Sequence, residues 1–348
     1  MIERSQNYLA NILSTLCAEI GASLFLEPVF QRAGYIEFKN GKKVFFKGTS
    51  FDINGQGAAQ IAKDKDYSAR FLAMSGLQVP EGVLCFSPRF TEKMMRKNAE
   101  AARQLTSFSN AIAFAEQHGY PLIVKPNEGS EGDGVRRIVG VEDLCLHISK
   151  LFNEHERVLV QRQYDGSDYR VVVLDGNVIS AYRRIPLNIV GDGTASVIDL
   201  MQAKAKEIKN SGRNPTLVLD QFAISEFLAV SGRSSTDIPG DGEVWPLLPN
   251  ANLSMGGEIE DVTDVICPEF SEISAQAASA LGLRYAGVDI LCSGIHQFDP
   301  SYIVLEVNSA PGLNNFGRSG KRKNDKVVEL YRVLIENLMK EQNYDEKQ

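Results

Sequence analysis

The sequence predicts a mixed α/β (α+β) protein whose sheets are rich in antiparallel pairs. Short apolar runs bounded by glycine, proline, asparagine or aspartate are typical of strands joined by tight turns. Between them lie longer segments whose apolar residues recur three or four positions apart, which is the spacing of amphipathic helices. At 348 residues the chain is long enough for two or three lobes around a large buried core.

Residues 1–60 are expected to form a small N-terminal lobe. A helix opens it, because apolar residues recur at helical spacing from Leu9 to Ile20. Glu19 falls within this segment, which lacks the basic start and uninterrupted apolar middle of a secretory signal. Three strand-like runs follow, SLFLEPVF, YIEFKN and KVFFKG, and turn residues separate them.

Residues 61–118 predict a central, mostly helical part that leads into the next lobe. Helices are expected at about Asp64–Ser75, Thr91–Leu105 and Ser109–His118, and Gly76 and Gly119 are the expected stops of the first and last. Residues 119–190 change to strands and glycine-rich turns. Within them Asp175-Gly176 predicts a tight hairpin between two alternating runs.

Residues 191–348 are assigned to a second subdomain that contains an insert at 195–250. A helix near Val197–Asn210 is followed by a less regular segment up to about Asn250. Pro268 begins another helix, at the position where its missing N–H is tolerated, and Gly282 ends it. The last helix presents one apolar stripe, made of Val327, Leu330, Tyr331, Leu334, Ile335 and Leu338.

Composition excludes several classes of protein. The formal net charge of -7 argues against a broad nucleic-acid surface, and no apolar run approaches the roughly 18–20 residues of a membrane span. Five scattered cysteines without a CxxC pair, and four scattered histidines, indicate reduced thiols rather than disulfides or a zinc site. We therefore expect a soluble cytoplasmic protein.

Two short stretches, AGVDIL and YIVLEVNSAPGL, predict a metal site. Glu306 and Asn308 are two residues apart and project from the same face of a strand, and Asp289 lies on the polar face of the earlier run. If the runs are neighbours, two carboxylates and an amide oxygen converge, which suits Mg²⁺ with substrate phosphates in its remaining positions. The alternative is a pair of edge strands with solvated acids.

A glycine-rich loop follows the apolar run that ends at Lys125. Its backbone N–H groups can approach phosphate oxygens, and we expect contacts from Gly129, Ser130, Gly132 and Gly134. The loop lacks the GxxxxGK[ST] pattern and is therefore not a Walker P-loop. Taken alone, the loop favours an ordinary hairpin tip over nucleotide binding.

The next segment carries candidates for nucleotide and phosphoryl contacts. Gln161, Gln163 and Tyr164 lie where a strand leads into a turn, so that backbone edge is placed to pair with an adenine. Asp168 follows as a candidate acceptor for ribose hydroxyls. Arg183 and Arg184 are adjacent, so only one faces the site, where a cation would neutralise charge during phosphoryl transfer.

These motifs together resemble the ATP-grasp ligases, most closely the ATP-grasp portion of cyanophycin synthetases and the matching part of bifunctional glutathione synthetases. The similarity runs from about Ile61 to about Met339. It includes IAKDKDYSARFLAMSGLQVPEG, IVKPNEGSEGDGV, DYRVVVLDG, RRIPLNIVGDG, NANLSMGGEIEDVTD, AGVDIL and EVNSAPGL. The resemblance implies the ATP-grasp fold, with two α/β subdomains that grip ATP, in addition to the N-terminal lobe.

The resemblance also implies residue roles. Lys65 and Lys125 correspond to the two lysines that bind ATP phosphates, and the loop at 129–134 corresponds to the flap over them. Gln161 stands where the family often has a glutamate that reads adenine. The remaining assignments are Asp168 as the ribose-binding acid, Arg184 as the cation near the γ-phosphate, and Asp289, Glu306 and Asn308 as the magnesium triad.

The implied activity is ATP-dependent joining of a carboxylate to an amine through an acyl phosphate, with an amino acid or small peptide as substrate. The implied cofactors are ATP and two Mg²⁺ ions, and Mn²⁺ is an alternative metal. The resemblance leaves open whether the chain forms a homo-oligomer, either a dimer or a tetramer. The loop LSMGGEIEDVTD resembles the family's acceptor loop, so Ser254, Gly256, Gly257 and Gly312 are candidate substrate contacts. The basic run at 317–324 either holds an acidic substrate or is a solvated charge run.

Three departures from the family pattern bear on this reading. D-alanine–D-alanine ligases have an arginine two residues before the metal aspartate, where this chain has Gly287. The chain also lacks the second ligase domain of cyanophycin synthetases and the cysteine-ligating domain of glutathione synthetases. We therefore expect a free-standing ligase. A catalytically silent ATP-binding regulatory module, and a small-molecule kinase without an amine acceptor, are the competing hypotheses.

Overall fold

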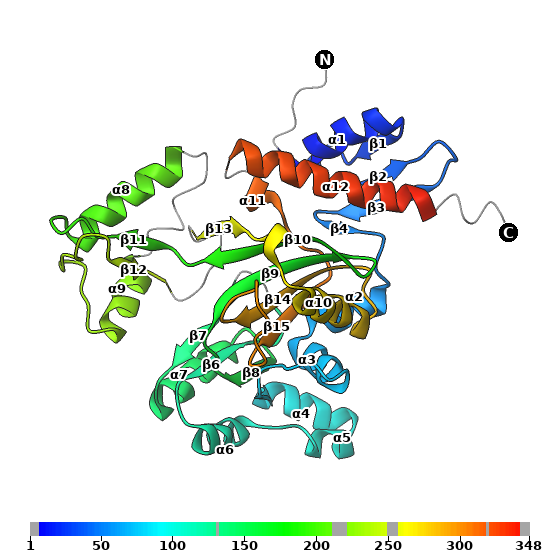
Figure 1. Ribbon diagram of the computed structural model, residues 1–348. Coiled ribbons are helices and arrows are strands. Elements are labelled where there is room, and N and C mark those ends of the chain that lie inside the picture. The colour runs from blue at the N-terminus through cyan, green and yellow to red at the C-terminus, as the bar shows by residue number, and fades with distance from the viewer. Residues whose placement is uncertain (1–6, 130–131, 211–220, 249–256, 318–319, 342–348) are drawn as a thin grey trace.

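The computed structural model describes residues 7–129, 132–210, 221–248, 257–317 and 320–341 (Figure 1). Every strand pairing in these ranges is antiparallel, as the sequence predicts. Within the same ranges, none of the helices combines the length and the apolar character that a membrane crossing requires.

The N-terminal lobe packs a helix and a four-stranded sheet against the end of the chain. The Asn7 side chain caps α1 (Tyr8–Ile20), and Gly21 ends it with a φ of 70°. The long helix α12 (Lys321–Glu341) shares the lobe's apolar core and lies beside α1 in Figure 1. The strands, in sheet order, are β1 (Ser23–Leu26), β2 (Ala33–Glu37), β3 (Lys43–Lys47) and β4 (Ser50–Phe51).

A five-stranded sheet forms the centre of the molecule. Its order is β13 (Glu258–Asp261), β10 (Asn177–Ile185), β9 (Ser167–Leu174), β14 (Tyr285–Cys292) and β15 (Ile303–Asn308). The predicted hairpin turn joins β9 to β10, and Asp175 and Gly176 both have positive φ values, 47° and 77°. This conformation matches the right-handed twist of the flanking strands.

The two faces of the central sheet differ. One face is apolar along its length and packs against α10 (Pro268–Ala280), with α2 (Gln56–Lys63) and α3 (Lys65–Met74) beside β15 (Figure 1). On the other face, Val172 and Leu174 join the core shared with the N-terminal lobe, whereas Asp168 and Arg170 earlier on the same strand do not. This second face of the sheet is therefore buried in the apolar core around Val172 and Leu174 and polar around Asp168 and Arg170.

A second sheet, in the order β5-β8-β6-β7, forms a separate lobe with its own apolar core under α6 and α7. The expected helix over Thr91–Leu105 is two helices instead, because Asn98 leaves the helical conformation and its side chain caps the second of them. The elements are β5 (Gly82–Phe86), α4 (Pro88–Lys97), α5 (Ala99–Arg103), α6 (Phe108–His118), β6 (Leu122–Pro126), β7 (Arg136–Ile138), α7 (Val141–Leu151) and β8 (Arg157–Arg162).

The predicted insert forms a compact unit that projects to one side in Figure 1. Its small core is built around Trp245, Ile224 and Leu228. The less regular segment expected up to Asn250 contains a helix, α9, so that part of the prediction is wrong. The elements are β11 (Asn188–Val190), α8 (Val197–Asn210), α9 (Gln221–Val230) and β12 (Val244–Pro246); the short helices η3 (Thr263–Val265) and α11 (Asn314–Gly317) lie later in the chain.

The central sheet draws strands from both sides of residue 190, where the sequence analysis places a subdomain boundary. Strands β9 and β10 precede that boundary, whereas β14 and β15 lie more than ninety residues beyond it. An alternating pattern shows that a segment is a strand but not which sheet it joins. The proposed division of the chain therefore stays a prediction about subdomains, while the hydrogen-bonded sheet spans it.

Candidate functional site

A cavity of about 990 Å³ lies where the central sheet, the β5–β8 sheet and the N-terminal lobe meet. Eight lysine or arginine side chains line it, against four aspartate or glutamate side chains. Since the chain as a whole carries a net charge of -7, this excess of cations is local. The cavity is thus suited to anionic ligands.

The three predicted metal residues come together on the polar face of the central sheet. Asp289 on β14 lies directly opposite Glu306 on β15, and Asn308 follows two residues later on the same face. The Asn308 amide donates a hydrogen bond to the Glu306 carboxylate at 3.1 Å. All three residues line the cavity.

Two arginines hold the Asp289 carboxylate. Arg170, directly opposite on β9, forms a two-pronged ion pair, in which Nη2 donates to Oδ2 at 2.7 Å and Nε donates to Oδ1. Arg184 Nη2 lies 2.9 Å from the same Oδ2. Burial alone would raise the pKa of Asp289, but the two guanidinium groups outweigh it and keep that pKa below its ordinary value.

Arg184 also binds Asp168, which lies opposite it on β9, through a hydrogen bond of 2.7 Å. Burial raises the pKa of Asp168, although Arg184 opposes that shift. Arg183 points away from these acids. Its guanidinium lies 3.7 Å from Glu260 and its side chain is 42% exposed. Both arginines line the cavity, but Arg184 is the member of the pair that contacts Asp168 and Asp289.

Arg170 occupies the space above Gly287. A Cβ at residue 287 would lie 2.9 Å from Arg170 Cδ and 2.9 Å from Pro311 Cβ, which is closer than packed carbons approach. Any side chain at this position would therefore displace Arg170. Gly287, which departs from the pattern of the D-alanine–D-alanine ligases, thus leaves room for Arg170 of the neighbouring strand. The Arg170 guanidinium contacts Asp289.

The two predicted phosphate lysines line the same cavity. Lys65 begins α3, and its ammonium donates to the Gly129 carbonyl at 3.1 Å. Lys125 is the penultimate residue of β6, and within the described residues its ammonium makes no hydrogen bond or ion pair. Burial lowers the pKa of Lys125 to about 8, with a contribution from Lys65, while Glu306 and Asp289 oppose the shift. An added anion would therefore bind Lys125 without displacing a protein partner.

The glycine loop depends on its glycines for its shape. Gly129, Gly132 and Gly134 have φ values of 151°, 78° and 68°, a region that other residues rarely adopt. At Gly134 a Cβ would also lie 2.9 Å from the Pro126 ring. Ser130, the fourth predicted contact, lies outside the described residues.

The side chains of the predicted adenine segment are buried or bound to other parts of the protein. Gln161 is buried in the middle of the β5–β8 sheet, between β5 and β6. The Gln163 side chain accepts a hydrogen bond from Arg137 at 2.8 Å, and the Tyr164 hydroxyl accepts one from the Glu81 N–H at 3.1 Å. Because these side chains have protein partners, the assignment of this segment to adenine binding stays a prediction.

The predicted substrate residues are only partly assembled. Gly312 is exposed and lines the cavity, whereas Gly257 is buried and is not among the lining residues. Ser254 and Gly256 lie outside the described residues. In the basic run, Lys323 donates to the Ile259 carbonyl at 3.2 Å and lies over the Phe316 ring, so this lysine has a structural partner.

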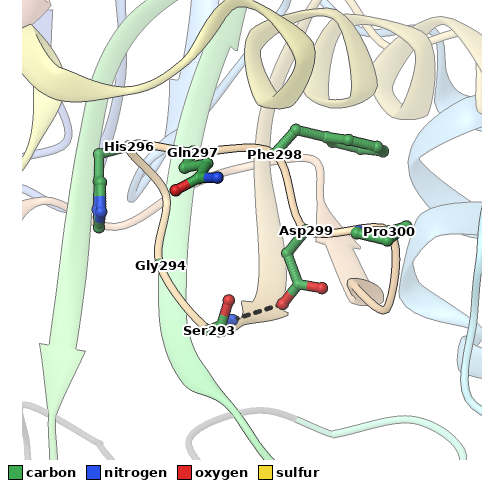
Figure 2. Close-up of a pocket in the computed structure, with 7 residues that line it drawn as sticks. All are labelled: Ser293, Gly294, His296, Gln297, Phe298, Asp299 and Pro300. Atoms are coloured by element: carbon green, nitrogen blue, oxygen red, sulfur yellow. Dashed lines mark hydrogen bonds between the residues drawn. The ribbon is translucent and has the colours of Figure 1, made fainter.

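A smaller pocket of about 260 Å³ lies in the loop between β14 and β15, and its lining spans residues 293–300 (Figure 2). The Asp299 carboxylate accepts a hydrogen bond from the Ser301 hydroxyl at 2.6 Å and from the Ser293 and Ser301 N–H groups, each at 2.9 Å, and these bonds lower its pKa. Its oxygens thus stabilise the loop. The pocket shares no lining residue with the large cavity.

Comparisons with known proteins agree with this arrangement. Residues 249–330 match a family model described as a RimK-like ATP-grasp domain, and residues 91–210 match the D-ala D-ala ligase C-terminus. The cyanophycin synthetase of Synechocystis sp. is 31% identical over 267 residues, which cover 73% of this chain. This chain belongs to the ATP-grasp superfamily. The resemblance inferred from the motifs is thereby confirmed.

Other relatives of this ATP-grasp protein are similar over most of its length. The cyanophycin synthetase of Nostoc sp. is 29% identical over 77% of the chain, and the glutathione biosynthesis bifunctional protein GshAB of Enterococcus faecalis is 27% identical over 94%. The chain spans only 28% of the length of either cyanophycin synthetase and 46% of that GshAB. ATP-grasp ligases use ATP together with Mg²⁺.

A solved structure supports the fold. The bifunctional glutathione synthetase of Pasteurella multocida superposes with a TM-score of 0.58 at 20% identity, and the match covers 92% of this chain and 43% of the other. The predicted ATP-grasp fold with a mixed α/β architecture is confirmed.

The sequence alone assigns no role to Arg170. The signal was available, because Arg170 is two residues after Asp168 and so shares its face of the strand. What the sequence lacked was the register of β9 against β14, which places Arg170 opposite Asp289.

Proposed function

We propose that this ATP-grasp protein is an ATP-dependent ligase that joins the carboxylate of an amino acid or small peptide to an amine. One observation carries the proposal. Asp289, Glu306 and Asn308 converge on a cavity that Lys65 and Lys125 also line. A nucleoside triphosphate with a divalent cation requires this pairing of hard oxygen donors and cationic side chains.

The donor set fits magnesium. Two carboxylates and an amide oxygen are hard ligands, and they leave coordination positions for phosphate oxygens. We propose that Asp289, Glu306 and Asn308 would hold two Mg²⁺ ions. When bound, the metal neutralises phosphate charge during transfer. Among the described residues, no group of three or more histidine, cysteine, aspartate or glutamate side chains offers a competing metal site.

The chain's own side chains have distinct parts in the proposed reaction. Transfer of the γ-phosphoryl group to the substrate carboxylate forms an acyl phosphate, from which the attacking amine displaces phosphate. Lys65 and Lys125 would bind the phosphates of ATP. Arg170 and Arg184 lie beside the acids, where cations stabilise charge on the transferred group. The glycine loop would cover the site and exclude water, which otherwise hydrolyses the acyl phosphate.

Arg170 is proposed to take over the oxyanion contact that Gly287 cannot provide. Its guanidinium reaches the Asp289 carboxylate across the space that a side chain at residue 287 would fill. Gly287→Ala introduces only a methyl group, yet it should displace Arg170. We expect this variant to lose turnover while it still binds ATP.

An assay of ADP release separates the three hypotheses. The purified chain is mixed with ATP, Mg²⁺ and pairs of amino acids, and products are read by mass for a species lighter than the summed substrates by one water. Release that requires both substrates supports the ligase. Release with one substrate alone identifies a kinase, and binding of ATP without turnover identifies a silent module.

A further inference from the structure

A loop of the N-terminal lobe carries a cation to the far end of the cavity. The Glu27 carboxylate accepts hydrogen bonds from the N–H groups of Val29, Phe30 and Arg32, at 2.9 to 3.1 Å. Gln31 has a φ of 53°, and the Arg32 carbonyl accepts from the Gly48 N–H at 2.7 Å. These contacts fix the backbone at Arg32, whose side chain lines the cavity.

Arg32 lines the same cavity as the proposed metal residues. Thr49, next to Gly48, donates its hydroxyl to the Ala310 carbonyl at 3.0 Å. Ala310 is four residues beyond Glu306, and four residues of extended chain span at most about 13 Å. Thr49 and Ala310, through which the N-terminal lobe contacts the segment after β15, line the cavity together with Arg32.

Position along the central sheet separates the two ends of the cavity. The strand pairing places Ser167 and Cys292, next to the predicted adenine segment, at one end of β9 and β14. Asp289 and Glu306 come next along the strands, and Ala310 with Thr49 lies beyond them. A nucleotide that runs from the adenine segment to the acids therefore ends before it reaches Arg32.

Among the residues that the structure describes, none pairs with the Arg32 guanidinium. Unlike Arg170 and Arg184, which are paired with acids, it makes no ion pair or side-chain hydrogen bond with any residue of the described ranges. Glu27, five residues earlier in the chain, already accepts from backbone N–H groups. An unpaired surface arginine is common by itself, but this one lines the cavity on a backbone held by several hydrogen bonds.

We propose that Arg32 binds a second, non-reacting carboxylate of the substrate, so that this protein acts on short dicarboxylates such as acidic amino acids. The inference rests on the proposed function, because the first carboxylate is the one activated beside Glu306. The planar guanidinium binds a carboxylate through two parallel hydrogen bonds. A monoamide of the same shape lacks that charge and leaves Arg32 unpaired.

Calorimetric binding tests the proposal without relying on turnover. The whole chain, saturated with Mg²⁺ and a non-hydrolysable ATP analogue, is titrated with succinate, glutarate, L-aspartate and L-glutamate, and with their monoamides succinamate, glutaramate, L-asparagine and L-glutamine. We expect at least one acid to bind at least tenfold more tightly than its monoamide. Arg32→Gln should remove that preference. The control, Arg103→Gln, changes an exposed arginine of α5 outside the cavity and should keep it.

The outcomes separate this inference from the proposed function. If no acid outbinds its monoamide, or if Arg32→Gln keeps the preference, the assignment of Arg32 is wrong even where the protein ligates neutral substrates. If the preference exists and depends on Arg32, but ATP is never turned over, the carboxylate site stands and the ligase proposal fails.

Discussion

Two ion pairs with the same geometry and different burial allow a direct test of the arginine cluster. Arg170 and Asp289 form a two-pronged pair whose side chains are 12% and 2% exposed. Arg284 and Asp175 form a pair of the same type, at 2.7 and 2.8 Å, with side chains 38% and 32% exposed. Replacement of each arginine by methionine removes the charge and keeps much of the aliphatic stem.

The expected losses in free energy of unfolding differ severalfold. Removal of one partner from a buried pair costs about 3–5 kcal/mol, because the remaining charge is left without compensation. Arg184 still contacts Asp289, so we expect about 3 kcal/mol for Arg170→Met. An exposed pair contributes about 1 kcal/mol or less, which is the expected loss for Arg284→Met.

The measurement is urea denaturation of wild type and both variants at pH 7, with the comparison repeated toward pH 4. In wild type the lowered pKa of Asp289 adds stability above the ordinary carboxyl pKa of 3.8, and this stability is lost as the pH falls through the folded value. In Arg170→Met, burial should raise the pKa of Asp289, so protonation relieves the defect. The difference in free energy of unfolding between this variant and wild type should therefore decrease as the pH falls.

Equal losses in the two variants would refute the argument from burial. A loss below about 0.5 kcal/mol for Arg170→Met would show that Asp289 is not held as a buried charge. If the difference in free energy of unfolding between Arg170→Met and wild type increased toward pH 4, the assigned lowering of the Asp289 pKa would be contradicted.

Three further predictions concern nucleotide binding and turnover. Because the pKa of Lys125 is lowered to about 8, the affinity of wild type for Mg-ATP should fall as the pH rises from 7 to 9.5. The affinity of Lys125→Arg should stay constant over the same range. A constant affinity in wild type would count against a phosphate contact of Lys125. Gly134 has a φ of 68°, and a Cβ there would lie 2.9 Å from the Pro126 ring. Gly134→Ala should therefore weaken ATP binding and lower the free energy of unfolding by about 1–2 kcal/mol. Wild-type values of both quantities would show that the loop tolerates a side chain. Arg184→Ala should reduce ADP release by about 10²–10³-fold, whereas Arg183→Ala should stay within about twofold, and similar effects in the two would remove the distinction between them.

Local patterns in the sequence predicted much of the site. Alternation along a strand placed Glu306 and Asn308 on one face, and the two-residue turn at Asp175-Gly176 set the hairpin that carries Asp168 and Arg184. These inferences need only the geometry of a single strand or turn.

Contacts between distant strands could not be predicted in the same way. The register of β9 against β14 joins residues about 120 positions apart, and it alone places Arg170 beside Asp289. The same limit explains why the role of Gly287 emerged only with the structure. Arg32 lies in a turn of the N-terminal lobe, and no nearby motif links that turn to the segment after β15.

Anomalous diffraction from crystals grown with Mn²⁺ and ADP tests the central claim most directly. Manganese replaces magnesium at oxygen sites and can be located by its own signal. We predict peaks coordinated by Asp289, Glu306 and Asn308, with phosphate oxygens completing the shell. Manganese bound elsewhere in the nucleotide complex, with Asp289 still paired to Arg170 and Arg184, would contradict the account.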